Sequence, residues 1–315
     1  MDQNINSVSA DTKKKPNKTW IEIKKHKVIY LMLIPIIAFY IIFHYIPILG
    51  NVIAFQDYKI TRGVFASKFV GFKHFATFLQ DVYFWRLLRN TVVINLYNLI
   101  FSFPMPIILA LLLNEVRNKS FKKAVQTITY MPHFISIVIV CGLVKNFVAT
   151  DGVINAVITA LGGDPVQFLT TPKYFPAIYT ISGIWQEIGW SSIIYLSALS
   201  GIDQELYEAA AIDGASRWKQ TLHITLPGLL PTISILLIMK VGHMLSVGFE
   251  KVMLLYNPVI YETADTISTY VYRQGILDAN FSYSAAVGLF NSIINFSLLM
   301  FANSVSKKSS GNGLF

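Results

Sequence analysis

Aromatic and polar side chains interrupt the apolar stretch from Phe175 to Leu199, and their types suit the binding of a hydroxylated ring compound such as a sugar. Aromatic faces stack on sugar rings, while amide and carboxyl groups exchange hydrogen bonds with hydroxyls. The six residues are Tyr179, Trp185, Gln186, Glu187, Trp190 and Tyr195. Trp185 and Trp190 do not fall on one face of a helix, so we expect only some of the six to line a cavity. The others would face lipid or pack against neighbouring helices.

Two charged residues, Glu187 and Lys240, lie near the middle of apolar stretches. A charge at that depth in a membrane is costly, and it usually faces the protein interior or water. Two hypotheses follow: a buried ion pair between Glu187 and Lys240, or Glu187 alone facing a cavity. Alternatively, Lys240 extends to the membrane surface and Glu187 hydrogen-bonds to backbone. Asn291 and Asn295, one helical turn apart, are further cavity candidates, although asparagine also joins helices to one another.

No residue pattern predicts catalysis or a metal site. Cys141 is the only cysteine, which excludes a disulfide within the chain. His133 follows Met131 and Pro132 without a partner His or Cys nearby, so we interpret it as a packing residue at a kink. The phosphate loop G-x-x-x-x-G-K-[ST] and the hydrolase motifs H-E-x-x-H and G-x-S-x-G do not occur. The chain is therefore not expected to hydrolyse ATP by itself.

The composition predicts an all-α polytopic membrane protein. Of the 315 residues, 54% are hydrophobic and 14% are charged, and the mean hydropathy is +0.51. A bilayer core requires about 20 mostly apolar residues per helix. Six stretches meet this requirement: Val28–Leu49, Thr91–Leu113, Thr127–Phe147, Phe175–Leu199, Gly228–Val247 and Phe281–Asn303.

Basic residues beside these spans predict that both termini are cytosolic, in a bacterial plasma membrane. The net charge of +9 is explained in the same way, because the lysines cluster next to apolar runs. The predicted inner segments carry Lys24, Lys25, Lys27, Arg117, Lys119, Lys122, Lys123, Arg217, Lys219, Lys307 and Lys308. The first span lacks a small-residue cleavage site, so we expect a retained anchor.

This topology divides the chain into successive segments. They are a basic cytosolic tail (1–27), a first membrane helix (28–49), an extracytoplasmic loop (50–90), a core of five membrane helices that includes the segment 201–227 (91–303) and a cytosolic tail (304–315). The loop 50–90 also carries six basic residues, which weakens the charge rule without reversing it. Within it, residues 81–89 predict an interfacial helix with Tyr83 and Trp85 at headgroup level. Residues 162–172 read as a loop, and an outer helix is expected around 266–275.

A polar segment between two apolar runs, residues 201–227, is predicted to be a docking surface for a soluble cytosolic partner. Asp203 can cap a first helix, and Gly214 can adopt the left-handed conformation that ends it. Ser216 can cap a second helix, Arg217–Ile224, which Pro227 should prevent from running straight into the next span. The segment would present to this partner one carboxylate, that of Glu208, and an apolar stripe. The stripe consists of Leu206, Ala210, Trp218 and Leu222.

The segment resembles the EAA loop of ABC-transporter permeases. It has Glu208-Ala209-Ala210, Gly214 six positions after the glutamate, and Ile224-Thr-Leu-Pro227 at its end. Similarity to carbohydrate permeases of the LplB-like branch continues in Asn90-Thr91, Pro104-Met-Pro106, Leu112-Leu-Asn-Glu-Val116, Tyr130-Met-Pro-His-Phe134, Gly183-Ile-Trp-Gln-Glu-Ile-Gly-Trp190 and Gly311-Asn-Gly313. The resemblance implies a type I ABC importer permease fold with cytosolic coupling helices. The implied ATPase-coupling residues are Glu208, Ala209, Ala210, Asp213, Gly214, Trp218, Leu222 and Pro227.

The same resemblance implies partners and a mechanism. A second homologous permease, a pair of cytosolic ABC ATPases and an extracytoplasmic sugar-binding lipoprotein would complete an importer for oligosaccharides or polysaccharide fragments. ATP and Mg would bind to the ATPase, with no cofactor on this chain, and transport would proceed by alternating access. Two alternatives stay open: an ABC importer for a non-sugar solute, and an ATP-independent secondary transporter. A secondary transporter would need inverted repeats or an ion site at the midplane of the membrane. The sequence shows no paired interrupted spans in matching halves.

Overall fold

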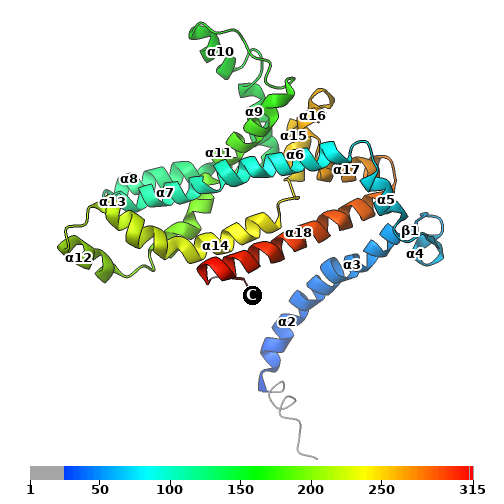
Figure 1. Cartoon of the computed structure of the whole chain (residues 1–315), viewed down its shortest axis with the longest axis horizontal. Helices are drawn as coiled ribbons and strands as arrows, with labels where there is room; N and C mark the ends of the chain where they lie inside the picture. The colour runs from blue at the N-terminus through cyan, green and yellow to red at the C-terminus, as the bar shows by residue number, and fades with distance from the viewer. Residues whose placement is uncertain (1–24, 312, 315) are drawn as a thin grey trace, which may run out of the picture. The chain divides into compact units, whose positions relative to one another are not determined.

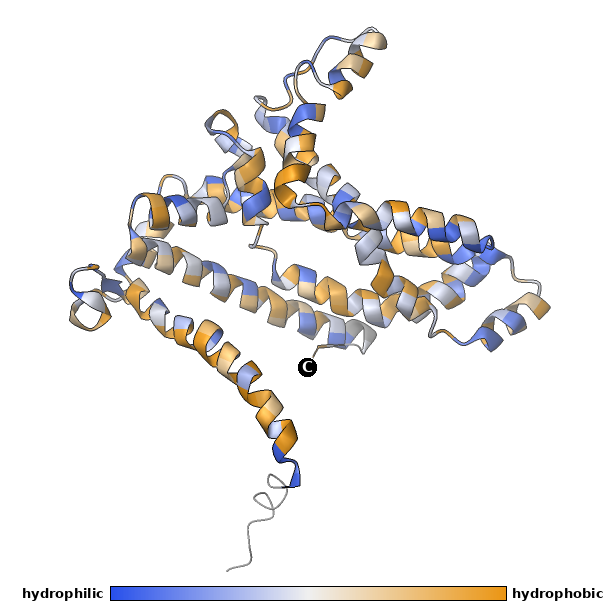
Figure 2. Ribbon diagram, turned by 180° about the vertical axis from the view of Figure 1, so that it is seen from behind, coloured by the Kyte–Doolittle hydropathy of each residue, from blue (hydrophilic) through white to orange (hydrophobic). Residues whose placement is uncertain are grey.

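The computed structural model describes residues 25–311, 313 and 314, and the chain divides into two units, Met1–Val52 and Ile53–Phe315. Most of the predicted basic tail, up to residue 24, lies outside the described residues. The first unit contains α2 (Lys27–Tyr40), a π-helical turn η1 (Ile41–Tyr45) and α3 (Ile46–Gly50), followed by the 3-10 turn η2 (Asn51–Phe55). Figure 2 shows mostly hydrophobic residues around α2 and α3. The predicted first span is therefore a continuous helix.

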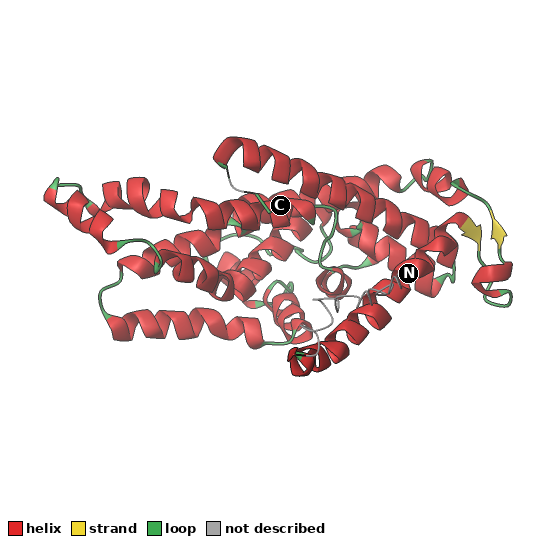
Figure 3. Cartoon of the chain, turned by 90° about the horizontal axis from the view of Figure 1, so that it is seen from below, coloured by secondary structure: helices red, strands yellow, loops and turns green. Residues whose placement is uncertain are grey.

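The described part of the second unit consists of helices joined by loops, with one small two-stranded ribbon (Figures 1 and 3). Strands β1 (Gln56–Asp57) and β2 (Lys68–Phe69) pair antiparallel, with Gln56 opposite Phe69. The first helical elements are α4 (Gly63–Ala66), α5 (Lys73–Leu79), α6 (Phe84–Tyr97), η3 (Asn98–Ser102), α7 (Pro104–Glu115), α8 (Lys119–Tyr130), η4 (Met131–Phe134), α9 (Ile137–Phe147), α10 (Val153–Ala160) and η5 (Pro172–Tyr174).

The remaining elements begin with the central helix α11. They are α11 (Phe175–Leu199), α12 (Gln204–Ile212), α13 (Arg217–Gln220), η6 (Thr221–Thr225), α14 (Leu226–Gly242), α15 (Phe249–Leu255), η7 (Pro258–Ile260), α16 (Tyr261–Ala264), α17 (Ile267–Tyr272), η8 (Arg273–Leu277) and α18 (Phe281–Ser310). The predicted loop at 162–172 is confirmed. So is a helix around 266–275, which is α17 with its extension η8, and Thr266 caps it through a capping box with Thr269.

Among the described residues, four helices are long and apolar enough to cross a membrane: Lys27–Phe55, Phe84–Glu115, Arg217–Gly242 and Phe281–Lys308. The count becomes five if the bent pair α8 and α9 forms one span. The predicted span Thr127–Phe147, with its kink at Met131-Pro132-His133, falls on this pair, whose two helices meet at an angle of 102°. Pro132 lies in the 3-10 turn η4, and the backbone at Ser136 leaves the helical conformation before α9 begins.

Helix α11 corresponds to the fourth of the six predicted spans, and its composition sets it apart from the four apolar helices. It is continuous over 25 residues, but its serines and the pair Gln186-Glu187 lower its hydropathy. Ten of its residues are buried, and it packs against α6, α7, α8 and α14. Such a helix, covered by neighbours on several sides, tolerates polar residues because they face protein instead of lipid.

Gly189 of α11 marks a close approach between α11 and α8. A Cβ atom at this position would overlap the backbone carbonyl of Thr129. We expect Gly189→Ala to lower the free energy of unfolding by about 1–2 kcal/mol, since the two helices would have to separate. Denaturation of the purified protein in detergent, followed by circular dichroism, measures the change. Gly288→Ala in α18 is the matched control, because nothing lies within 4 Å of a Cβ there. Equal effects of the two substitutions would contradict the predicted close packing.

The segment predicted as a separate interfacial helix at 81–89 is instead the start of α6. From Phe84 the helix runs through the π-helical turn η3 into α7 without interruption, as far as Glu115. The π-helical turn η3 ends just before Pro104, which has no backbone N–H to donate. The wider turn accommodates the proline, so the helix continues into α7. Trp85 is exposed, as the interfacial prediction required.

A buried carboxylate, Asp265, fastens the segment 258–278 to the start of α6. Its side chain is fully buried and binds the Arg273 guanidinium through two hydrogen bonds of 2.8 and 2.7 Å. Arg86 of α6 adds a third at 3.0 Å. The amide of Asn90 also donates to the Asp265 carbonyl. Two arginines from different elements therefore converge on one buried acid.

A second carboxylate, Asp81, joins α17 and α18 to the turn before α6. Both Tyr270 and Tyr283 donate hydrogen bonds from their hydroxyls to its Oδ2 atom. Burial alone would raise the pKa of Asp81, but hydrogen bonds from Tyr270, from the backbone N–H of Tyr83 and from Tyr283 hold it below its ordinary value. Asp81 and Asp265 together make this end of the molecule a connected polar cluster.

Candidate functional site

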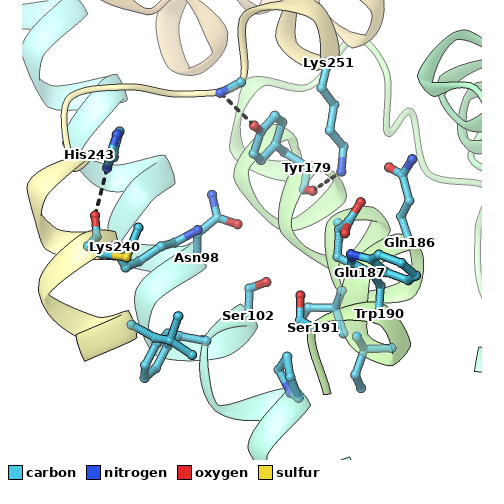
Figure 4. A pocket seen from close by; sticks show the side chains of 18 of the residues that line it. Asn98, Ser102, Tyr179, Gln186, Glu187, Trp190, Ser191, Lys240, His243 and Lys251 are labelled. Carbon is cyan, nitrogen blue, oxygen red and sulfur yellow. Dashed lines mark hydrogen bonds between the residues drawn. The ribbon is translucent and has the colours of Figure 1, made fainter. Parts of the chain in front are cut away.

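A cavity of about 1150 Å³ opens between η3, the start of α7, α11, α14 and α15 (Figure 4). Among the six residues predicted on α11, Tyr179, Gln186, Glu187, Trp190 and Tyr195 line it. Trp185 does not, which confirms that the two tryptophans have different faces. The cavity has both aromatic and hydrogen-bonding groups on its walls, as the sequence predicted for a sugar pathway.

Glu187 and Trp190 are held in place by His133, which the sequence indicated only as a packing residue. The Nδ1 atom of His133 lies 2.9 Å from the Oε2 atom of Glu187. The His133 ring also stacks on Trp190, with ring centroids 4.4 Å apart and planes 3° from parallel. His133 reaches α11 because η4 breaks the helix between α8 and α9 at this level. Pro132 indicates a kink next to His133 in the sequence. It does not indicate which neighbouring helix the His133 side chain contacts.

The hypothesis of an ion pair between Glu187 and Lys240 is wrong. Both residues line the cavity, but Figure 4 shows Lys240 on the α14 side and Glu187 on the opposite side, on α11. Within the part of the chain that the structure describes, no ion pair joins them, and Glu187 pairs with His133. The pairing was inferred from similar depth in two neighbouring spans, whereas contact also requires both helices to turn these faces towards each other.

Lys251 of α15 is a cavity residue that the sequence analysis missed. Its Nζ atom donates to the backbone carbonyl of Tyr179 at 3.0 Å and lies 4.8 Å from the centroid of the Tyr179 ring. Burial lowers the pKa of Lys251 to about 8, so the ammonium is still mostly protonated at neutral pH. The Tyr179 hydroxyl in turn accepts a hydrogen bond from the backbone N–H of Gly248 at 3.2 Å.

The η3 side of the cavity carries Asn98 and Ser102, which were also not predicted. They are four residues apart, so they lie on one face of the helix. Two polar residues spaced four apart inside an apolar span are a sequence pattern from which these cavity residues could have been predicted. Asn291 and Asn295 do not line the cavity. Asn295 donates to Ser246 and accepts from the backbone of Leu245, so it joins α18 to the chain after α14.

The predicted docking segment has the expected local structure, with one correction. Asp203 accepts a hydrogen bond from the Glu205 N–H at the start of α12, and Gly214 has a φ of +74°. Ser216 caps α13 as predicted, through the Lys219 N–H. However, Pro227 does not stop the second helix: α13, η6 and α14 form one helix, Arg217–Gly242. The π-helical turn η6 comes directly before α14, and Pro227 lies in the first turn of α14. Proline is tolerated at this position although it has no backbone N–H to donate.

The surface of this segment is largely unpartnered. All predicted coupling residues are exposed except Ala210, which is half-buried: Glu208, Ala209, Asp213, Gly214, Trp218, Leu222 and Pro227. Leu206 and Ile212 are exposed as well. The segment is tied to the end of α7 by an ion pair between Arg217 and Glu115, with 2.8 Å between Nη1 and Oε2. Figure 1 shows α12 and α13 at that end of α7 and α8.

No group of three or more potential metal ligands occurs within the described residues 25–311, 313 and 314. The walls of the cavity carry hydrogen-bonding groups, aromatic faces and charges.

Comparison with known proteins identifies the family. The profile of the binding-protein-dependent transport system inner membrane component family matches residues 102–310. The chain belongs to this family. The permease is 45% identical over 304 residues to the polygalacturonan/rhamnogalacturonan transport system permease protein YteP of Bacillus subtilis, covering 96% of this chain and 95% of that one. It is also 45% identical to protein LplB of Bacillus subtilis, over 93% and 92% of the two chains.

A solved structure has the same fold. The permease superposes with a TM-score of 0.86 and 45% identity on a chain of a bacterial ABC transporter involved in the import of the acidic polysaccharide alginate, covering 93% of this chain and 100% of that one. A second structure contains the alginate transporter in complex with an alginate pentasaccharide-bound periplasmic protein, and here the TM-score is 0.87. The predicted fold class, a helical ABC importer permease, is therefore confirmed. Permeases of this family are non-catalytic subunits, and a separate ATPase hydrolyses ATP.

Proposed function

We propose that the permease imports oligosaccharides or polysaccharide fragments by alternating access. The observation that carries this proposal is the cavity wall in which the stacked pair His133 and Trp190 lies beside the Glu187 carboxylate. A tryptophan face and a carboxylate are suited to one sugar ring, because they satisfy its apolar face and its hydroxyls. The named substrates of the relatives are polysaccharides, which supports the same class of cargo.

The proposed topology has six spans, with α11 and the bent pair α8 and α9 each counted as one. Helices α6 and α7 then cross from the outer end at Phe84 to the inner end at Glu115. The ion pair between Arg217 and Glu115 puts the segment 201–227 at this inner end. The basic residues between α7 and α8 follow directly on Glu115, which supports a cytosolic location and both termini inside. The membrane would be the bacterial plasma membrane.

The partners proposed for this assembly follow from the exposed surfaces. Segment 201–227 would dock in a cleft of the cytosolic ATPase pair, which binds ATP and Mg. A second, homologous permease would complete the cavity, and an extracytoplasmic sugar-binding lipoprotein would deliver the cargo. The alginate transporter crystallised with its periplasmic binding protein supports the last of these.

Reconstitution tests the proposed function. We expect the permease, co-purified with its second permease and ATPase pair in proteoliposomes, to accumulate labelled oligosaccharide only with ATP and with the binding protein present. Uptake is measured by rapid filtration, with non-hydrolysable nucleotide as the control. Uptake driven by an ion gradient without an ATPase would instead indicate a secondary transporter. ATP-dependent uptake of peptides but not of saccharides would contradict the proposed cargo.

A further inference from the structure

Lys251 is a buried cation on the wall of the cavity, and the Glu187 carboxylate, which favours its charged form, does not form an ion pair with it. The residue is only 8% exposed, yet it lines the cavity. Its single hydrogen bond goes to the Tyr179 carbonyl, although an ammonium has three N–H donors. No ion pair involves it within residues 25–311, 313 and 314. A buried charge that forms no direct ion pair is costly, so its position calls for an explanation other than stability.

The ammonium group is held at a defined point by α11. Gly183 has no side chain, and a Cβ there would lie 3.1 Å from the Lys251 Nζ atom. This room lets the ammonium lie against the helix backbone next to Tyr179. The Tyr179 ring, 4.8 Å away, adds a cation–π contact. Figure 4 shows the Lys251 ammonium on the same side of the cavity as Gln186 and Glu187. A positive charge is therefore fixed within reach of a ligand in the sugar pathway.

The cavity lining carries two lysines, Lys240 and Lys251, and two glutamates, Glu187 and Glu250. Glu187 forms its ion pair with His133, at 2.9 Å, and not with Lys251, so the Lys251 ammonium keeps N–H donors for a carboxylate of a ligand. Lys240 supplies a second cation from the α14 side. A ligand with carboxylates along its length could therefore meet positive charge on two walls of the cavity, while its hydroxyls and ring faces meet Glu187 and Trp190.

We propose that Lys251 selects acidic saccharides, because its ammonium binds a carboxylate of a uronic acid residue during transport. The proposal rests on the proposed function of the permease and assigns it a substrate class and a specificity-determining residue. A charge-assisted hydrogen bond of this kind, made where water is largely excluded, is strong and discriminates against a neutral group of the same shape.

The test uses two probes of the same shape and different charge: trigalacturonate and its fully methyl-esterified form. ATP-dependent uptake of both is measured in proteoliposomes that hold the complete importer with its binding protein. We expect Lys251→Met to lower uptake of the acid roughly tenfold, with uptake of the ester changed less than about twofold. Lys251→Arg should keep the preference for the acid, since it keeps the charge. Lys145→Met on α9, a partly buried lysine outside the cavity lining, is the control and should change neither rate.

The acid-to-ester ratio separates recognition from a structural role. Because all variants use the same binding protein, a change in the ratio comes from the permease. Equal losses for both probes would overturn the proposal and make Lys251 a tie between α15 and α11. An unchanged ratio would overturn it as well. A wild-type importer that transports the ester but not the acid would leave the proposed function intact and refute this inference alone, whereas failure to import any saccharide with ATP would refute the proposed function.

Discussion

Asp265→Asn is expected to lower the free energy of unfolding of the permease by about 3 kcal/mol. Breaking a buried pair by removing one partner typically costs about 3–5 kcal/mol, because the remaining charge is left uncompensated. The lower end applies here, since the side chains of Arg86 and Arg273 are 30% and 21% exposed and water can partly solvate them. Denaturation of the purified permease in detergent, monitored by tryptophan fluorescence, gives the difference from wild type.

Asp278→Asn provides the matched control for this experiment. Asp278 also lies in the segment 258–278, but it is exposed. Among the described side chains, only Gln274 donates a hydrogen bond to its carboxylate. Its replacement should change stability by less than about 0.5 kcal/mol. If the Asp265 and Asp278 variants unfold alike, the cluster that joins 258–278 to α6 is not a stabilising element. The same comparison tests whether the segment 258–278 folds together with the membrane helices.

The local structure of segment 201–227 could be predicted from sequence because its signals act within one or two helical turns. The caps at Asp203 and Ser216 and the left-handed Gly214 each depend on a side chain and its nearest backbone neighbours. Pro227 was misjudged because its effect depends on the preceding turn. A π-helical turn can precede a proline without ending the helix, and no residue pattern distinguishes that outcome from a stop.

The cavity was predicted only in part, because its geometry depends on how each helix is rotated about its axis. The α11 residues were found from their types, but the partner of Glu187 was not. His133 reaches Glu187 only because the chain bends by 102° after η4, and the sequence indicated a kink without its angle. Lys251 was missed for a different reason: it lies outside the predicted spans, in α15, and enters the cavity only because Gly183 leaves room for it.

The proposed docking of the ATPase makes Trp218 the most sensitive position of the coupling surface. Its side chain is 71% exposed, and Leu206 and Ile212 of the same segment are exposed as well. Exposed tryptophans within apolar patches are frequent binding hot spots, with losses of about 2 kcal/mol or more on truncation. We therefore expect Trp218→Ala to weaken binding of the ATPase roughly 30-fold, which is 2 kcal/mol at 1.4 kcal/mol per factor of ten. Titration of the permease pair in nanodiscs with labelled ATPase measures the dissociation constant.

Trp85→Ala distinguishes docking from a general effect of losing an exposed tryptophan. Trp85 is 74% exposed, nearly the same as Trp218, but it lies in the first turn of the helix that ends at Glu115. Because Glu115 binds Arg217, the two tryptophans are close to opposite ends of that helix, roughly 45 Å apart at 1.5 Å per residue. Only one of them can contact a cytosolic subunit. Loss of ATPase binding in the Trp85 variant, with normal binding in the Trp218 variant, would reverse the proposed topology; equal binding in both would remove Trp218 from the interface.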